Sequence, residues 1–332
     1  MKRHAKKEKE RIKVIIALAA ITSAIFMGLN IGGNNAAASM GAAYGAKART
    51  KKQAVILIAI FSFLGAVISG GDVVRTLGND IVPGNTITLV AAIIAIAAAA
   101  LSLFIGNILK VPVSASQSIV GSIVGIGIFF GVLDTSLLTE IVGWWVVTPV
   151  LAFTLAFICG KFIHPKLLIW LIDHESEAKI RSIITKLLTA SGCYVAYSAG
   201  ANNAASAVGP LVGAGFFDQT TGTIIGGLTL GAGALLIGGR ILQTVGDDIT
   251  ELCTIRAIFI EGIAAVIVHG ASHAGIPVSL GQIVPAAIIG IGCANEGFNT
   301  VKSKTVKRIG LMWITSPIIA GLIAFGAMRI VS

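Results

Sequence analysis

Long apolar runs, separated by short polar segments, follow one another along most of the chain. Their approximate bounds are 14–29, 36–46, 53–70, 86–109, 112–131, 137–160, 183–200, 204–217, 221–240, 257–270, 276–292 and 309–330. Because a helix needs about 20 apolar residues to cross a bilayer, these runs predict an all-α polytopic membrane protein. The alternating strands of roughly ten residues that a membrane barrel needs are absent from the sequence. Runs too short for a full crossing, such as 14–29 and 36–46, predict broken or re-entrant helices at the membrane midplane.

Composition supports the same class of protein and excludes others. Of the 332 residues, 55% are hydrophobic and 12% are charged, with a mean hydropathy of +0.91, whereas a soluble domain has about 25% charged residues. The net charge is +10, but the basic residues gather in tails and loops without an accompanying aromatic pattern, so we expect no nucleic-acid partner. Metalloprotease, P-loop, serine-hydrolase and dinucleotide signatures are missing. We therefore expect no enzyme, no cofactor and no certain metal site.

The chain contains an internal duplication. Gly33-Asn34-Asn35-Ala36-Ala37 matches Ala201-Asn202-Asn203-Ala204-Ala205, and the glycine pairs at 70–71 and 238–239 match at the same offset of 168. Pro112-Val113-Ser114 matches Pro277-Val278-Ser279 at an offset of 165, and Trp145 and Pro149 match Trp313 and Pro317 at 168. Four landmarks in one order predict two structural repeats of about five to six membrane segments each.

These matches divide the chain into four parts. They are a basic N-terminal tail (1–13), a first membrane repeat (14–160), a polar connecting loop (161–182) and a second membrane repeat (183–332). Loop 47–52 is basic whereas its counterpart 215–220 is not, and loop 132–140 is acidic whereas its counterpart 293–308 is basic. This opposite bias predicts two inverted repeats. One feature disagrees, because inversion places the basic tail and the basic segment 161–186 on opposite sides of the membrane.

Adjacent asparagines lie within an apolar run of each repeat, as Asn34-Asn35 and Asn202-Asn203. Polar side chains in hydrocarbon are costly unless they have partners, and glycine lets a backbone unwind and approach a ligand. We therefore predict an unwound centre in each repeat, with Asn34 and Asn202 at the substrate and Asn35, Asn203 and Ser206 at an ion site. The alternative is close helix packing in which asparagine forms interhelical hydrogen bonds.

The second repeated motif has Pro-Val-Ser at the start of an apolar run. Such a start predicts a helix N-terminus capped by serine, and the exposed N–H groups of a helix N-terminus form an anion site. Two such starts from inverted repeats would face each other across the midplane. The candidate anion-binding residues are Ser114, Ala115, Ser116, Gln117, Ser279, Leu280 and Gln282. The alternative is ordinary capping next to a loop.

Four charged residues at or within the apolar runs are candidates for gating or ion coupling. Asp72, Arg75 and Arg240 stand at the ends of runs, where they serve either anion attraction and gating or plain anchoring at the interface. Glu261 and His269 share one run at a spacing of eight residues, so they lie on roughly one helix face. They are candidates for a proton relay, with a structural role as the alternative.

The paired motifs resemble those of the inorganic phosphate transporter family, in which each half carries a Gly-Ala-Asn-Asp-Val-Ala-Asn-Ala type signature. Residues 32–39 and 200–207 stand in those places. The segment 27–45 and the Pro-Val-Ser-Leu sequence at 277–280 are still more similar to the sulfate permease branch of that family. The resemblance covers nearly the whole chain. It implies an inverted-repeat fold, ion-coupled uptake of an oxyanion and a homodimer.

The sequence departs from the family signature at the residues that matter for coupling. The signature aspartate is Asn35 in the first half and Asn203 in the second, and its following asparagine is Ala38 and Ser206. In the family, that aspartate and asparagine are implied to bind sodium, and a neutral amide is a weaker ligand for a hard cation than a carboxylate. Coupling to protons is therefore favoured over coupling to sodium.

The same departures favour sulfate as the substrate. Phosphate near neutral pH still carries a proton that it can donate to a carboxylate, whereas sulfate needs donors only. We therefore predict a multi-pass secondary transporter in the cell membrane that imports sulfate or a related oxyanion together with a proton. The alternatives are a phosphate symporter and an anion channel of the same fold.

Overall fold

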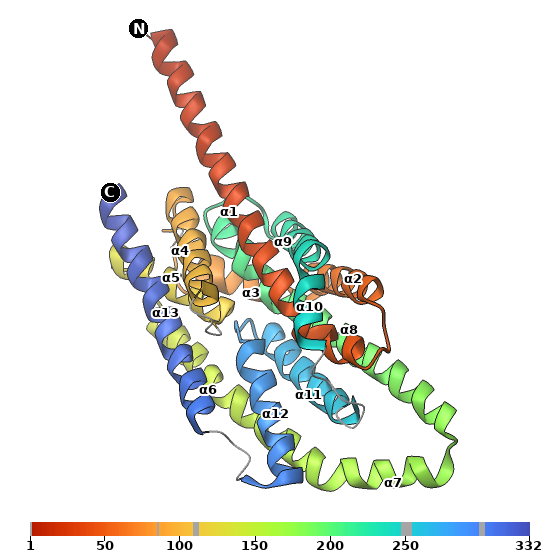
Figure 1. The fold of residues 1–332 in the computed structure, drawn as a ribbon. Helices are drawn as coiled ribbons and strands as arrows, with labels where there is room; N and C mark the ends of the chain where they lie inside the picture. The colour runs from red at the N-terminus through yellow and green to blue at the C-terminus, as the bar shows by residue number, and fades with distance from the viewer. Residues whose placement is uncertain (1, 85, 109–112, 247–253, 299–302) are drawn as a thin grey trace.

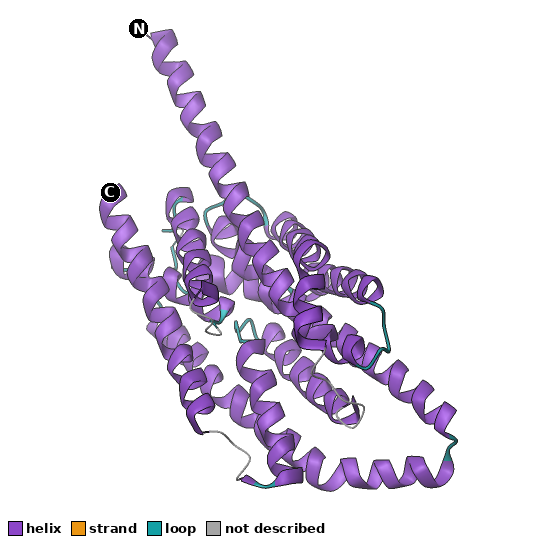
Figure 2. Cartoon of the chain, viewed as in Figure 1, coloured by secondary structure: helices purple, strands orange, loops and turns teal. Residues whose placement is uncertain are grey.

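The computed structural model describes residues 2–84, 86–108, 113–246, 254–298 and 303–332, and this part of the chain is built of helices joined by short loops (Figures 1 and 2). Three of the elements, η1 to η3, are single π-helical segments. The elements in order are α1 (Lys2–Gly45), α2 (Lys51–Ser69), α3 (Gly71–Arg75), η1 (Thr76–Asp80), α4 (Leu89–Ile108), α5 (Ala115–Phe130), α6 (Thr135–Ile158), η2 (Cys159–Ile163), α7 (His164–His174), α8 (Glu177–Gly213), α9 (Gln219–Gly233), η3 (Ala234–Gly238), α10 (Gly239–Gly246), α11 (Thr254–His273), α12 (Leu280–Glu296) and α13 (Ser303–Val331). The predicted all-α class is confirmed.

Six of the described helical segments are long and apolar enough to cross a membrane. They are Lys6–Gly45, Lys51–Ser69, Thr135–His174, Gln219–Gln243, Thr254–His273 and Trp313–Val331. Large apolar side chains, among them Ile68, Leu236 and Leu322, point outward from the bundle. An outward apolar surface of this extent suits lipid and not water. The protein is therefore a multi-pass integral membrane protein. The apolar helices α5 and α12 are shorter than a crossing. The runs 14–29 and 36–46, predicted to be broken or re-entrant, instead belong to the single continuous helix α1.

The duplication in the sequence reappears in the helix boundaries. Helices α1 and α8 end at equivalent glycines, and α2 and α9, and α5 and α12, begin at equivalent residues (Gly45 and Gly213, Lys51 and Gln219, Ala115 and Leu280). The helix caps repeat as well. Thr50 accepts a hydrogen bond from the backbone N–H of Gln53, and Asp218 accepts one from that of Thr221. Hydrogen bonds from the hydroxyl and backbone of Thr221 hold the pKa of the Asp218 carboxyl below its usual value.

The two halves are interleaved through reciprocal contacts at glycines. Gly200 of α8 lies against the backbone carbonyl of Ser62 on α2, and its counterpart Gly32 of α1 lies against that of Leu230 on α9. The contact of α5 with α13 is matched in the same way by that of α12 with α6. Reciprocal contacts of this kind are what a two-fold relation produces. The opposite membrane orientation of the two halves stays a prediction, as does the division at 14–160 and 183–332.

We expect Gly200→Ala to destabilise the bundle strongly, because an added Cβ would collide with the Ser62 carbonyl, which belongs to a rigid backbone. Gly262→Ala on α11 is the matched control, since nothing lies within 4 Å of a Cβ there. The control should keep or slightly raise stability because alanine favours a helix by about 1 kcal/mol over glycine. Thermal unfolding of the purified variants measures the difference. Equal melting temperatures for both would contradict the close packing of α8 on α2.

The predicted unwinding at the asparagine pairs is wrong. Helices α1 and α8 continue through Asn34-Asn35 and Asn202-Asn203 without a break. The glycines of these motifs serve close approach to neighbouring helices instead, and such packing supplies most of the stability of a helix. The interruptions that matter for the site lie between α4 and α5 and between α11 and α12. The connection at 161–182, expected to be a loop, contains helix α7 and the first residues of α8.

Candidate substrate and ion site

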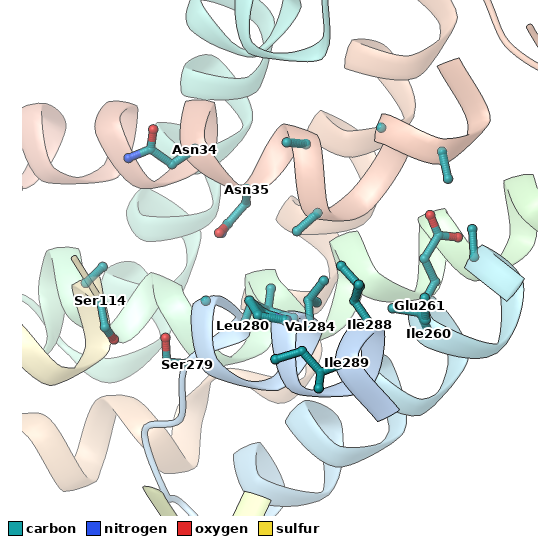
Figure 3. A pocket seen from close by; sticks show the side chains of 18 of the residues that line it. Asn34, Asn35, Ser114, Ile260, Glu261, Ser279, Leu280, Val284, Ile288 and Ile289 are labelled. Carbon is teal, nitrogen blue, oxygen red and sulfur yellow. The ribbon is translucent and has the colours of Figure 1, made fainter. Parts of the chain in front are cut away.

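A cavity of about 850 Å³ lies between α1, α5, α8, α11 and α12. Asn34, Asn35, Ser114 and Ser279 gather at one end of it, and Glu261 lies at the other (Figure 3). The side chains of Leu280, Val284 and Ile288 line the space between the two ends. The cavity therefore joins a polar end built from both halves of the chain to a buried carboxyl group.

Helix α5 begins at the polar end of the cavity. Its N-cap residue Ser114 accepts a hydrogen bond from the backbone N–H of Gln117 at 3.2 Å, which confirms the predicted capping. The hydroxyl proton of Ser114 remains available to a ligand. Ala115 and Ser116 carry the first N–H groups of the helix, which in an α-helix have no partner within the helix itself, and both residues line the cavity. Pro112, which belongs to the predicted motif, lies outside the described residues.

Helix α12 begins at the same place and presents the equivalent groups. Ser279 occupies the N-cap position, makes no side-chain capping bond and lines the cavity with Leu280 and Gly281. The loop before it is held from the other half of the chain, because the indole N–H of Trp145 donates to the carbonyl of Pro277 at 2.8 Å. The predicted convergence of two helix N-termini at one site is thus present in the structure.

The asparagines of the two halves have different surroundings. Ser116 on α5 donates a hydrogen bond to Oδ1 of Asn203 on α8 at 3.1 Å. The residue equivalent to Ser116 is Gly281, which has no hydroxyl to offer Asn35. Asn35 is half-buried and lines the cavity. Because it has no hydroxyl donor equivalent to Ser116, its amide is available to a ligand. Both asparagines line the cavity, but only Asn203 is held there by a hydrogen bond from Ser116.

Asn202 has a different role from the one predicted. It is buried, and its amide group donates to Oγ of Ser272 at 3.0 Å and to the carbonyl of Ile276 at 3.1 Å. Its Oδ1 accepts from the backbone N–H of Val278 at 3.1 Å. Asn202 thus fixes the loop that places Ser279, and it does not line the cavity. Its counterpart Asn34 is exposed to the cavity.

Three other predicted residues lie buried outside the cavity lining. Gln117, Gln282 and Ser206 are each at most 1% exposed. Within the described part of the chain, Oε1 of both glutamines and Oγ of Ser206 have no hydrogen-bond partner. Buried oxygens without partners are uncommon in proteins, and neutral oxygens of this kind are able to bind a hard cation.

The predicted charged residues separate into two groups. Asp72, Arg75 and Arg240 are absent from the cavity lining, and Arg75 forms a 3.4 Å ion pair with Asp80 in an exposed position. Glu261 does line the cavity. Sequence reasoning missed Arg256 and Glu296, which pair across α11 and α12 at 3.2 Å and also line it. Both residues stand just outside the apolar runs 257–270 and 276–292, and this position was the feature of the sequence that could have marked them as candidates.

The fold and the site together define an integral membrane transporter, and comparison with known proteins identifies its family. A sequence model of the phosphate transporter family matches residues 31–324, so the chain belongs to that family. It is 42% identical to the sulfate permease CysP of Bacillus subtilis, over 93% of this chain and 86% of that protein. It is 29% identical to a putative phosphate permease of Thermococcus kodakarensis, over 89% of this chain and 93% of that one.

A solved structure described as the sodium-dependent phosphate transporter has the same fold. It superposes with a TM-score of 0.83 and covers 96% of this chain and 99% of its own, at 24% sequence identity. The interleaved helical architecture described above is therefore that of an experimentally determined transporter.

Proposed function

We propose that this protein imports sulfate across the cell membrane, driven by the inward movement of protons. The observation that carries the proposal is the chemistry of the polar end of the cavity. The hydroxyls of Ser114 and Ser279, the first N–H groups of α5 and α12 and the amides of Asn34 and Asn35 line it. Hydrogen-bond donors at two helix N-termini suit a dianion that needs donors only.

Among the described residues, no carboxylate lines this end of the cavity, which favours sulfate over phosphate. Phosphate near neutral pH carries a proton, which a neighbouring carboxylate accepts as a hydrogen bond. Asn35 and Asn203 replace the two carboxylates of the family signature. The similarity to the Bacillus subtilis sulfate permease supports the same substrate. The two inverted halves would move against each other around this site to give alternating access.

Sodium-coupled phosphate transport is the second candidate, and a specific observation favours it. The buried oxygens of Gln117, Gln282 and Ser206, which have no hydrogen-bond partner among the described residues, are neutral ligands of the type that a sodium ion accepts. The fold is shared with a transporter that is sodium-dependent and carries phosphate. An anion channel of the same fold is the third candidate.

Uptake by the purified protein in liposomes tests the proposal. With a proton gradient imposed, labelled sulfate should accumulate against its electrochemical gradient, and excess phosphate should leave the uptake unchanged. Blocked uptake in excess phosphate would replace sulfate with phosphate as the substrate. Accumulation that follows an imposed sodium gradient alone would establish sodium coupling. Equilibration without accumulation would identify a channel.

A further inference from the structure

Glu261 is a carboxyl group buried near the middle of a membrane-spanning helix. It is the eighth residue of α11 (Thr254–His273), is 5% exposed and contributes to the wall of the cavity. Oγ of Ser191 on α8 donates a hydrogen bond to its Oε2 at 2.5 Å. The ion pairs found among the described residues join other groups, so Glu261 has no cationic partner there.

The charged groups of the cavity do not neutralise Glu261. Arg256, on the same helix, pairs with Glu296 of α12 at 3.2 Å. Helix α1 lines the cavity with apolar residues and with the neutral amides of Asn34 and Asn35, and none of its lining residues is charged. The carboxylate is therefore isolated from compensating charge on the cavity side.

Among the described residues, the other elements packed around α11 bring titratable groups near Glu261 but form no ion pair with it. Arg49, which follows α1, lies close enough to act electrostatically on Cys193 of α8, as Glu261 does, and its Nη1 donates to the carbonyl of Ala48 at 3.2 Å. Helix α8 contributes Cys193 and Tyr194, and the hydroxyl of Tyr194 is 3.0 Å from Nδ1 of His269, two turns further along α11. His273 packs against His269 near the far end of α11. Asp72 of α3 lies beyond that end, near Gly275, and Glu140 of α6 is exposed.

An ionised carboxylate in such surroundings is costly, because hydrocarbon and protein interior solvate charge poorly. A dianion bound in the same cavity would repel it further. Protonation removes both costs, so proton binding at Glu261 and anion binding at the serines favour each other. By linkage, the two ligands raise each other's affinity by the same factor.

We propose that Glu261 is the residue that binds the coupling proton, taken from the cavity together with the anion, and that Ser191 is its positioning residue. The inference rests on the proposed import of sulfate. A proton from cavity water joins the Glu261 carboxylate to give the neutral carboxylic acid, and it leaves again as a proton on the opposite side of the membrane. No bond of the anion changes.

Glu261→Gln in the full-length protein, reconstituted in liposomes, tests the proposal with sulfate as the probe. Gln keeps the volume and polarity of the protonated side chain. In the wild type, exchange of labelled sulfate between sulfate-loaded liposomes and the medium should decline at alkaline pH, where Glu261 loses its proton. In the variant, exchange should persist without that decline. Accumulation driven by a proton gradient should disappear. For a gradient of one pH unit, the ratio of internal to external sulfate should therefore fall by about tenfold per coupled proton. Glu140→Gln, the same change at an exposed site on α6, should retain the wild-type pH profile and accumulation.

A wild-type pH profile with wild-type accumulation in Glu261→Gln would overturn the inference. So would a His269→Gln variant that, in place of Glu261→Gln, loses the alkaline decline and the proton-driven accumulation. Wild-type accumulation that responds only to sodium would overturn it while leaving sulfate import intact, whereas absence of sulfate exchange by the wild type would overturn the proposed function itself. Ser191→Ala provides a second test that keeps the carboxyl group. Because the carboxylate loses its hydroxyl donor, the pH at which exchange falls by half should rise, and an unchanged midpoint would contradict the positioning role.

Discussion

Replacing Ser114 and Ser279 together with alanine is expected to weaken sulfate binding by at least about a hundredfold. Each hydroxyl would donate to a charged oxygen, and a hydrogen bond to a charged group contributes about 1.5–3 kcal/mol. The two serines stand at equivalent positions in the two halves and line the same end of the cavity. The single variants should each show roughly half of the combined free-energy loss.

Isothermal calorimetry or tryptophan fluorescence on purified protein gives the dissociation constants. Ser122→Ala is the matched control on α5, because the hydroxyl of Ser122 is buried and donates to the carbonyl of Ile119 at 2.8 Å within its own helix. The control should bind sulfate as the wild type does. Wild-type affinity in the double serine variant would place the anion elsewhere in the cavity.

The elements that the sequence predicted well are those specified by local chemistry. A Pro-Val-Ser sequence followed by an apolar run stops one helix and starts the next, since proline and a serine cap act within a single turn. Ser114 and Ser279 therefore appear where expected. The repeat was also visible, because equivalent helices keep the same spacing even where the residues around their landmarks have diverged, as at Thr50 and Asp218.

The errors concern side chains whose role depends on contacts with elements far away along the chain. Gly32 and Gly200 are consistent with unwinding when viewed alone, but α9 and α2 press against them and keep both helices intact. The partners of Asn202 are 70 to 76 residues away along the chain, and no local pattern predicts them. Arg256 and Glu296 lie outside the apolar runs, and only the packing of α11 on α12 brings them to the cavity.

Asn202→Ala is expected to destabilise the protein by about 3 kcal/mol, while Asn34→Ala leaves its stability within about 0.5 kcal/mol of the wild type. The two asparagines occupy equivalent positions in equivalent helices, so the gain in helix propensity from alanine is common to both and cancels in the comparison. What differs is that Asn202 has three hydrogen-bond partners, whereas Asn34 faces the cavity.

Removing Asn202 leaves the N–H of Val278 and the carbonyl of Ile276 buried without that partner. The loop before Ser279 then leaves its native position more easily, so sulfate affinity should fall. The melting temperature should fall as well, by about 5 °C or more. In Asn34→Ala any loss of sulfate affinity should occur at an unchanged melting temperature. Equal melting temperatures for the two variants would contradict the role of Asn202 in fixing the loop before Ser279. The duplication placed the two asparagines in equivalent positions, so only the hydrogen bonds that Asn202 makes in the second half distinguish them.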